Sequence, residues 1–388
     1  MAAPQTNFAL VLSGGGARAA YQVGFLRALA RRFPDLSPQI ITGVSAGAVN
    51  AAYLANHFGT FAEKIEELRT LWANLRMDDV YRVTSSDLGR NVMRWGLRLM
   101  SGGSRTSPRP RSLVDTQPFR ERLMRVLNAA PDGTLTGIET NLRAGRLKAI
   151  AITTSSYTTG QSITWVQGDA IDQWERAQRK SMPCGLTVDH VLASSALPLF
   201  FPAVKLMGAW YGDGGIRLTA PLSPAVHLGA ERILAITTRY GRSRQEADQP
   251  MIDGYPPPAQ VAGVLLNAIF LDQLDGDALR LDRLNRLIDQ LPLEKRSGLR
   301  HIDLLVLRPS RDLGKIANQH EPQLPPALRF MLRGLGTRET RSNDMLSLIM
   351  FQSDYLNDLL ELGEADAEQY ANRIYELLGV EKKEEVNP

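Results

Sequence analysis

The sequence predicts an α/β fold in which helices cover a mainly parallel β-sheet and a further helical region follows at the C-terminal end. Short apolar runs of strand length alternate with longer stretches in which apolar residues recur at helical spacing. A run of three glycines follows the first apolar run, as is typical of a turn from a strand into a helix. Such alternation indicates parallel strands, because each return between them needs a crossover, usually a helix.

The amino-terminal part contains two strand-and-helix units. The apolar runs 8–12 and 39–42 are expected to be strands, and the stretches 17–32 and 46–58 are expected to be the helices that follow them. A third helix is expected over 61–75, where apolar residues repeat every three or four positions.

The rest of the chain continues this alternation and then becomes helical. Strands are expected over 147–153, 163–166, 204–206, 209–211, 232–237 and 302–307, and a helix is expected over 188–196. Met207 and Gly208 separate two of these strands and predict a hairpin. Three prolines precede a mostly helical stretch that ends near 291, and only helical patterns remain over 325–378. The apolar block 345–351 is expected to pack in the core, with docking to a membrane or to a second subunit as the alternatives.

Residues 86–111 fit neither pattern. Apolar side chains fall on one helical stripe and arginines on another: Leu88, Val92, Trp95 and Leu99 against Arg90, Arg94 and Arg98. This amphipathic character predicts an interfacial helix or a lid that faces a membrane. A surface helix whose apolar stripe packs on the core explains the pattern equally well.

The composition excludes several classes of protein. With 44% hydrophobic and 22% charged residues, the 388-residue chain is an ordinary globular protein rather than a disordered, collagenous or coiled-coil one. The single cysteine, Cys184, excludes an intrachain disulfide and a cysteine-based zinc site, and the five scattered histidines indicate no metal site. The net charge of +4 is compatible with an anionic membrane surface but too small to indicate nucleic acid.

No targeting or membrane-spanning segment is expected. The chain lacks a stretch of about 18 uninterrupted apolar residues, and its start lacks a basic segment followed by a long apolar run. We therefore expect a cytoplasmic protein, with peripheral contact at the inner face of the membrane and assembly into a homo-oligomer left open.

The motif Gly43-Val-Ser-Ala-Gly47 gives the clearest chemical signal. It lies between an expected strand and an alanine-rich helix, so Ser45 would stand on a tight turn with its hydroxyl exposed. Gly43 and Gly47 let the backbone turn without a clash at Cβ, and the amides at the start of the helix favour negative charge nearby. The placement predicts Ser45 as a nucleophile, although a five-residue pattern of this kind also arises by chance.

A glycine run opens the first helix and is followed by Arg18. Exposed backbone amides in such a turn can bind an oxyanion or a phosphate. The run by itself does not decide between these two kinds of ligand.

The same loop also supports a different interpretation. Gly14, Gly16 and Ala19 match the dinucleotide-binding fingerprint that follows a strand. That fingerprint expects an acidic residue at the end of the second strand, where this sequence has Ser45 and its glycines instead. We therefore favour one acyl-transfer site and keep nucleotide binding as the alternative.

The best candidate for the base is an aspartate rather than a histidine. An ordinary α/β-hydrolase places several strands before its nucleophile and a histidine late in the chain, whereas Ser45 comes far too early. Three histidines come late enough to serve, but none lies in a distinctive motif: His227, His301 and His320. Asp213 leaves the expected hairpin, and Gly214 and Gly215 let its backbone approach another strand end closely. It is either the general base of a Ser–Asp dyad or a turn aspartate.

Together these motifs resemble those of the patatin-like phospholipase family, in the family's order. The glycine-rich oxyanion loop, the GxSxG serine and the Asp-Gly-Gly/Ala motif of that family match 14–18, 43–47 and 213–215. Further matching stretches are 113–118, 193–198 with Phe201 and Pro202, and 221–230. The similarity covers about residues 7–240 and extends weakly to 307. It departs from the family at Ala19, where glycine is usual.

The resemblance implies a lipid acyl hydrolase with a three-layer α/β/α core. Ser45 and Asp213 would form its dyad, and no metal or organic cofactor would be needed. The N–H groups of the glycine loop would form the oxyanion hole, with Gly14, Gly15, Gly16 and Ala17 as its residues. We expect a patatin-like catalytic domain over 7–310 that contains 86–111 as a lid or membrane-facing insertion, and a helical extension over 311–388. The expected partner is an acyl lipid and not a nucleic acid.

Apolar residues close to Asp213 in the sequence are candidates for an acyl pocket. They are Leu197, Leu199, Phe200, Phe201 and Met207, and at least half of them could equally be core. A further alternative is a catalytically idle patatin-like scaffold. The presence of both Ser45 and Asp213 argues against it, because folding does not require this pair.

Overall fold

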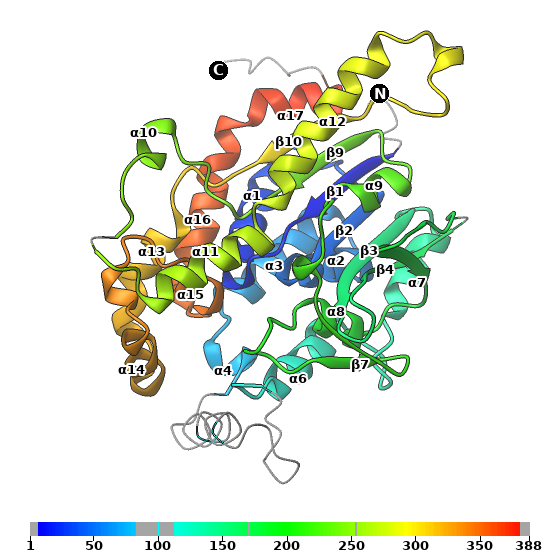
Figure 1. Cartoon of the computed structure of the whole chain (residues 1–388). Coiled ribbons are helices and arrows are strands. Elements are labelled where there is room, and N and C mark those ends of the chain that lie inside the picture. Colours follow the sequence, from blue (N-terminus) through cyan, green and yellow to red (C-terminus); the bar gives the residue numbers. More distant parts are fainter. Residues whose placement is uncertain are drawn as a thin grey trace, which may run out of the picture.

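The chain forms a three-layer α/β/α structure around one mixed sheet (Figure 1). The computed structural model describes residues 7–82, 112–169, 171–252 and 254–380, with Met93 and Met100 as isolated residues. The expected fold class, with its mainly parallel sheet and helical C-terminal region, is therefore confirmed. The expected lid or insertion over 86–111 lies outside the described residues, apart from Met93 and Met100.

The centre of the sheet consists of five parallel strands. In spatial order they are β10 (Asp303–Leu307), β9 (Arg232–Ile236), β1 (Phe8–Leu12), β2 (Ile40–Val44) and β3 (Ala149–Ser156). Beyond β3 the sheet continues through β4 (Ser162–Gly168), β6 (Arg179–Pro183) and β5 (Glu175–Arg176). The sequence predicts β1, β2, β3, β4, β9 and β10 but not β5 and β6, which are short and largely polar.

The predicted hairpin is present and is attached to the middle of the sheet. It consists of β7 (Val204–Leu206) and β8 (Ala209–Asp213), which pair in antiparallel register. β8 also pairs with β3, so that Asp213 stands opposite Thr154 near the carboxyl end of β3. This pairing brings residue 213 to the edge of the sheet at which β1 and β2 end.

Both faces of the sheet are buried, as the apolar composition of β1 requires. Phe8, Leu10 and Leu12 point into one core, and Ala9 and Val11 point into the other. The first core is covered by α1 (Ala20–Arg32), α2 (Ala46–Asn56), α3 (Phe61–Ala73) and α16 (Ser353–Gln369), and the second by α9 (Ser223–His227) and α12 (Gln273–Asp289).

The predicted block 345–351 packs in the core. The remaining described helices surround this frame. They are α4 (Met77–Val80), α6 (Gln117–Val126), α7 (Thr136–Arg143), α8 (Val188–Ser194), α10 (Arg244–Ala247), α11 (Pro258–Phe270), α13 (Leu313–His320), α14 (Pro326–Gly334), α15 (Asp344–Ile349) and α17 (Ala371–Leu378), with the 3-10 turns η1 (Gly16–Ala19), η2 (Gly214–Ile216), η3 (Leu293–Lys295), η4 (Glu321–Gln323) and η5 (Thr337–Glu339). Within the described ranges, no helix has both the length and the apolar composition of a bilayer span.

Candidate active site

Ser45 occupies a strained turn between β2 and α2. Its backbone has φ +56° and ψ −132°, a conformation that costs a non-glycine residue about 1–3 kcal/mol. The flanking glycines make the turn possible. A Cβ at Gly43 would overlap the carbonyl oxygen of Gly47, and a Cβ at Gly47 would overlap the carbonyl oxygens of Leu12 and Ser13. The turn therefore packs directly against the end of β1.

Two serines at the end of α8 hold the backbone of this turn. The Ser45 N–H donates to Ser194 Oγ (3.0 Å), and Ser194 Oγ donates in turn to the Thr153 carbonyl (2.7 Å). Ser195 Oγ donates to the carbonyl of Ser45 (2.9 Å). The strained residue is thus bonded on both sides, which is how a strained backbone persists. Neither serine is predicted from the sequence to act at the site, although both lie in the stretch 193–198, which resembles the family.

The hydroxyl of Ser45 is hydrogen-bonded to Asp213. Ser45 Oγ lies 2.6 Å from Asp213 Oδ2, and Asp213 Oδ1 accepts from the N–H of Gly215 (2.9 Å). The aspartate is 1% exposed. Burial raises the pKa of Asp213 to about 7, although both hydrogen bonds act in the opposite direction. A carboxylate with a proton affinity in this range is suited to accept the proton of a serine hydroxyl near neutral pH.

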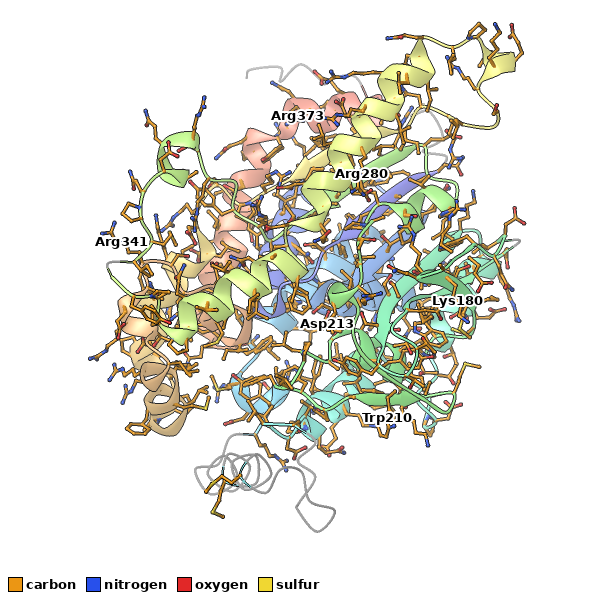
Figure 2. The ribbon with its side chains drawn as sticks, viewed as in Figure 1. Lys180, Trp210, Asp213, Arg280, Arg341 and Arg373 are labelled. Carbon is orange, nitrogen blue, oxygen red and sulfur yellow. The ribbon has the colours of Figure 1, made fainter. Side chains whose placement is uncertain are left out.

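The two glycines after Asp213 allow this approach. A Cβ at Gly214 would overlap the carbonyl oxygen of Thr153, and a Cβ at Gly215 would overlap the ring of Phe270. The Asp213 N–H donates to the carbonyl of Ala196 (3.0 Å), which ties the end of β8 to the loop after α8. Figure 2 shows Asp213 in the interior of the molecule, beside the carboxyl-terminal end of α11.

The glycine loop after β1 runs directly beside the serine. Gly15 and Gly16 have φ +146° and +56°, which glycine adopts readily. A Cβ at Gly14 would lie 3.0 Å from Ser45 Cβ. Thr238 Oγ1 donates to the Gly14 carbonyl (2.8 Å) and holds the loop from the side of β9. Within the part of the chain that the structure describes, the N–H groups of Gly14, Gly15 and Gly16 have no hydrogen-bond acceptor.

Arg18 points away from the serine and is buried against α15. Its side chain is 3% exposed and donates to Ser347 Oγ (2.7 Å), to Asp344 Oδ1 (2.7 Å) and to the Asp344 carbonyl (3.2 Å). The second carboxylate oxygen of Asp344 accepts from Asn267 Nδ2 (2.6 Å) on α11. A helix more than 320 residues away in the sequence therefore anchors the glycine loop.

Ser45 opens into an apolar cavity of about 670 Å³, a volume that includes its part open to solvent. It is lined by Gly16, Ser45, Ala46, Val49, Leu68, Leu71, Trp72, Leu75, Val80, Phe119, Arg122, Leu123, Val126, Ser195, Phe201 and Phe351. A smaller adjoining cavity is lined by Gly15, Gly16, Ser45, Ser195, Leu197, Phe201, Phe270, Leu348, Ile349 and Phe351. Ala17 lines neither of them. The first cavity has the apolar lining that a fatty acyl chain needs.

The candidate acyl-pocket residues divide into three groups. Leu197 and Phe201 line the cavities at Ser45, and Phe200 packs its ring edge against Tyr81. The expectation for Leu199 and Met207 is wrong, because their side chains are 68% and 76% exposed. Met207 lies at the turn between β7 and β8, and Leu199 lies in the loop after α8, so neither faces the interior.

The histidines considered as bases lie elsewhere. His227 stacks on Trp174, His301 pairs with Asp289, and none of His227, His301 and His320 lines a cavity with Ser45. Among the described residues, no three His, Cys, Asp or Glu side chains are grouped so as to hold a metal ion.

Comparison with known proteins agrees with the motifs. A family model described as patatin-like phospholipase matches residues 10–226, more than half of the chain. No curated protein sequence matches. Among solved structures, VipD from Legionella pneumophila is 15% identical with a TM-score of 0.41, covering 97% of this chain and 67% of VipD. Human GIVD cytosolic phospholipase A2, in complex with methyl γ-linolenyl fluorophosphonate, is 14% identical with a TM-score of 0.42, covering 96% of this chain and 59% of that protein.

Proposed function

Because this chain belongs to the patatin-like phospholipase family and is thus a hydrolase of carboxylic esters in lipids, we propose that Ser45 and Asp213 carry out the hydrolysis as a dyad. The observation that supports this most is the buried 2.6 Å hydrogen bond between Ser45 Oγ and Asp213 Oδ2. It lies where the glycine loop, the strained turn and the apolar cavity meet. No other titratable side chain bonds to Ser45 Oγ among the described residues.

Acylation begins when Asp213 Oδ2 takes the proton of Ser45 Oγ as that oxygen attacks the ester carbonyl carbon. The new C–O bond moves the π electrons of the carbonyl onto its oxygen. The N–H groups of Gly14, Gly15, Gly16 and Ala17 are the donors we assign to that oxyanion, and a well-placed donor contributes about 3 kcal/mol. Of these four residues, Gly15 and Gly16 line the cavities at Ser45.

Collapse of the intermediate expels the alcohol of the lipid, which takes its proton from Asp213. The acyl group then remains on Ser45 Oγ, with its chain in the apolar cavity. In deacylation Asp213 takes a proton from water, the hydroxide oxygen attacks the acyl carbon, and Ser45 recovers its proton as the fatty acid leaves. Protons and electrons balance with these side chains and water.

The proposal extends to the partner and the domain organisation. We propose that the substrate is an acyl lipid. The protein would reach it through peripheral contact with the membrane that contains the lipid. We also propose that 7–310 forms the catalytic domain and that 311–388 is a helical extension that shares its core, with Arg18, Gly43, Gly47, Gly214 and Gly215 supporting the site.

The test is hydrolysis of p-nitrophenyl esters from acetate to palmitate by wild type, Ser45→Ala and Asp213→Asn. We expect each variant to lose at least about a thousandfold in activity. The control is Ser162→Ala, which changes a buried serine on β4. This variant is expected to keep the activity of the wild type. Circular dichroism establishes that each variant is folded. Full activity in Ser45→Ala would overturn the nucleophile.

An inactive wild type would turn attention to the alternatives. Wild type would then be tested on phospholipid vesicles and for binding of NAD and ATP. Tight nucleotide binding without hydrolysis would favour the dinucleotide interpretation of Gly14, Gly16 and Ala19. Neither binding nor hydrolysis would favour an idle scaffold.

A further inference from the structure

One surface helix carries no charged residue. From Gly254 to Leu271, which includes all of α11, the sequence has no Asp, Glu, Lys or Arg. A surface helix ordinarily has an apolar stripe on the core and charged residues on its opposite face. The apolar composition of α11 therefore needs an explanation on the side that does not face the core.

The two sides of α11 differ in burial but not in polarity. Ala259 and Gly263 are buried, and the helix packs through this side on α15. Positions three and four residues apart point the other way: Val261, Val264 and Leu265 are 46%, 57% and 57% exposed, and Ala268 is exposed too. We call these four residues the α11 outer face. Single exposed apolar residues need no explanation, but a whole helical stripe marks an interaction surface.

The carboxyl-terminal end of α11 is part of the site. The ring of Phe270 lies against Gly215 and lines the smaller cavity together with Ser45. Leu197, Phe201 and Phe270, which all line this cavity, are only partly buried. Figure 1 shows α11 on the near side of the molecule, across the edge at which β1 and β2 end. Whatever covers the α11 outer face therefore lies on the helix whose carboxyl-terminal end contributes Phe270 to the site.

Exposed arginines lie near the amino-terminal end of α11. The Ala259 N–H donates to the carbonyl of Leu335 (2.8 Å), which joins the start of α11 to the segment that carries Arg338 and Arg341. Both arginines are exposed, as is Arg242, which borders Val264 across a polar groove. Four exposed arginines, Arg242, Arg244, Arg338 and Arg341, outnumber the two exposed acidic residues of these segments, Asp248 and Glu339, and Glu246 is partly exposed.

We propose that the α11 outer face docks on the surface of an anionic lipid bilayer, with the helix lying in the plane of the interface. An apolar helix side flanked by arginines fits the boundary between acyl chains and anionic headgroups. Tyr255, 93% exposed just before α11, is a residue type that favours this boundary. A second protein chain seated there would supply no substrate to the site at the end of this helix, whereas a bilayer of ester lipids would supply it. To that extent the inference rests on the proposed function.

The test compares two matched double variants of the full chain. Val264→Asp/Leu265→Asp places charges on the α11 outer face. Leu284→Asp/Leu287→Asp changes two leucines of α12 that are 47% and 58% exposed. Co-sedimentation uses vesicles of equimolar phosphatidylglycerol and phosphatidylcholine with ether-linked chains, which an ester hydrolase does not cleave. We expect the α11 variant to bind at least about tenfold more weakly than wild type and the α12 variant to bind like wild type.

Other outcomes would overturn the inference. These are wild-type binding by the α11 variant, an equal loss in both variants, or a change in the oligomeric mass of the α11 variant alone. If the α11 variant does not fold, a fluorophore is attached at Leu265→Cys in a Cys184→Ser background. Its emission should shift to the blue on vesicles, and a label at Leu287→Cys should not; equal shifts would overturn the inference.

A second readout separates this inference from the proposed function. With ester-linked vesicles, the ratio of vesicle hydrolysis to p-nitrophenyl butyrate hydrolysis should fall about tenfold in the α11 variant. If wild type hydrolyses neither substrate, the proposed function fails, while binding to ether-linked vesicles still decides the inference.

Discussion

The carboxylate of Asp213 is 1% exposed and accepts hydrogen bonds from Ser45 Oγ and from the N–H of Gly215. No cationic side chain lowers the pKa of this carboxyl group. The cost of burying its charge therefore outweighs the two hydrogen bonds and raises the pKa to about 7. The folded protein therefore binds this proton more tightly than the unfolded chain does. The same burial that destabilises the charged form gives the group the proton affinity of a useful base.

We expect the rate of ester hydrolysis to rise with pH as Asp213 loses its proton. Since only the ionised carboxylate accepts the Ser45 proton, kcat/KM should increase about tenfold per pH unit below about 7 and level off above it. The measurement is kcat/KM for p-nitrophenyl butyrate across this range, with the rate of Ser45→Ala subtracted at each pH. A profile that is flat between about pH 5 and 8 would contradict the role of Asp213.

Asp213→Asn should be more stable than wild type at alkaline pH. The folded-state pKa is above the ordinary value of 3.8, so the wild type loses stability as pH rises from that value through about 7. Asparagine has no charge to bury and retains both hydrogen bonds, accepting from Gly215 and donating to Ser45. Thermal unfolding should show a Tm advantage of a few degrees near pH 8 that disappears near pH 4. An advantage independent of pH would show that the carboxylate is not its source.

At the scale of elements, local patterns predicted the turn but not what holds it. The runs that became β1 and β2 were recognisable because parallel strands are apolar on both faces, and the motif 43–47 identified the turn that follows. The bonds from Ser194 and Ser195 to Ser45 join residues about 150 positions apart. The ion pair between Arg18 and Asp344 joins residues that are 326 apart. No periodicity encodes such contacts, which depend on the pairing of whole strands and helices.

Asp344 should act as a positioning residue for the glycine loop. Asp344→Asn removes the charge that pairs with the buried guanidinium of Arg18, so the loop that carries the oxyanion donors should lose its fixed position. We expect kcat to fall about tenfold with KM nearly unchanged, because the loss concerns the transition state.

The matched control for Asp344 is Glu364→Gln. Glu364 pairs with Arg27 (2.8 Å) between α16 and α1, away from Ser45. A merely structural role predicts equal effects of both variants on kcat, which would contradict the positioning role. Arg18→Lys should retain more activity than Arg18→Met, since lysine keeps the charge.

Val49 should limit the length of acyl chain that the cavity accepts. It lies one helical turn after Ser45 on α2 and lines the apolar cavity. Val49→Trp should fill space next to the acyl carbonyl, and the rate on p-nitrophenyl palmitate should fall at least about tenfold relative to the acetate. The acetate rate in the same variant is the internal control. An unchanged ratio of the two rates would show that the acyl chain lies elsewhere.

At the scale of the whole molecule, the C-terminal helices share the core of the amino-terminal half. A single hydrophobic cluster contains residues of α1, α2 and the central strands together with residues of α15, α16 and α17. α16 crosses α1 at glycines: a Cβ at Gly24 would overlap the carbonyl oxygen of Leu360, and a Cβ at Gly363 would overlap that of Tyr21. The family model ends at residue 226, so α15, α16 and α17 lie outside the part of the chain that it matches and pack against helices inside that part.

A chain that ends at residue 310 should therefore fail to fold. It would lose Tyr355, Leu356, Leu359 and Leu360 of α16, each fully buried, and each such side chain contributes about 2 kcal/mol on burial. Their sum is comparable to the net stability of a typical domain, about 5–15 kcal/mol. Loss of Arg18 contacts to α15 would also release the glycine loop. The measurement is cooperative thermal unfolding and ester hydrolysis of residues 1–310, with residues 1–380 as control. If the shorter chain unfolds cooperatively and hydrolyses esters like the control, residues 311–388 are a dispensable extension.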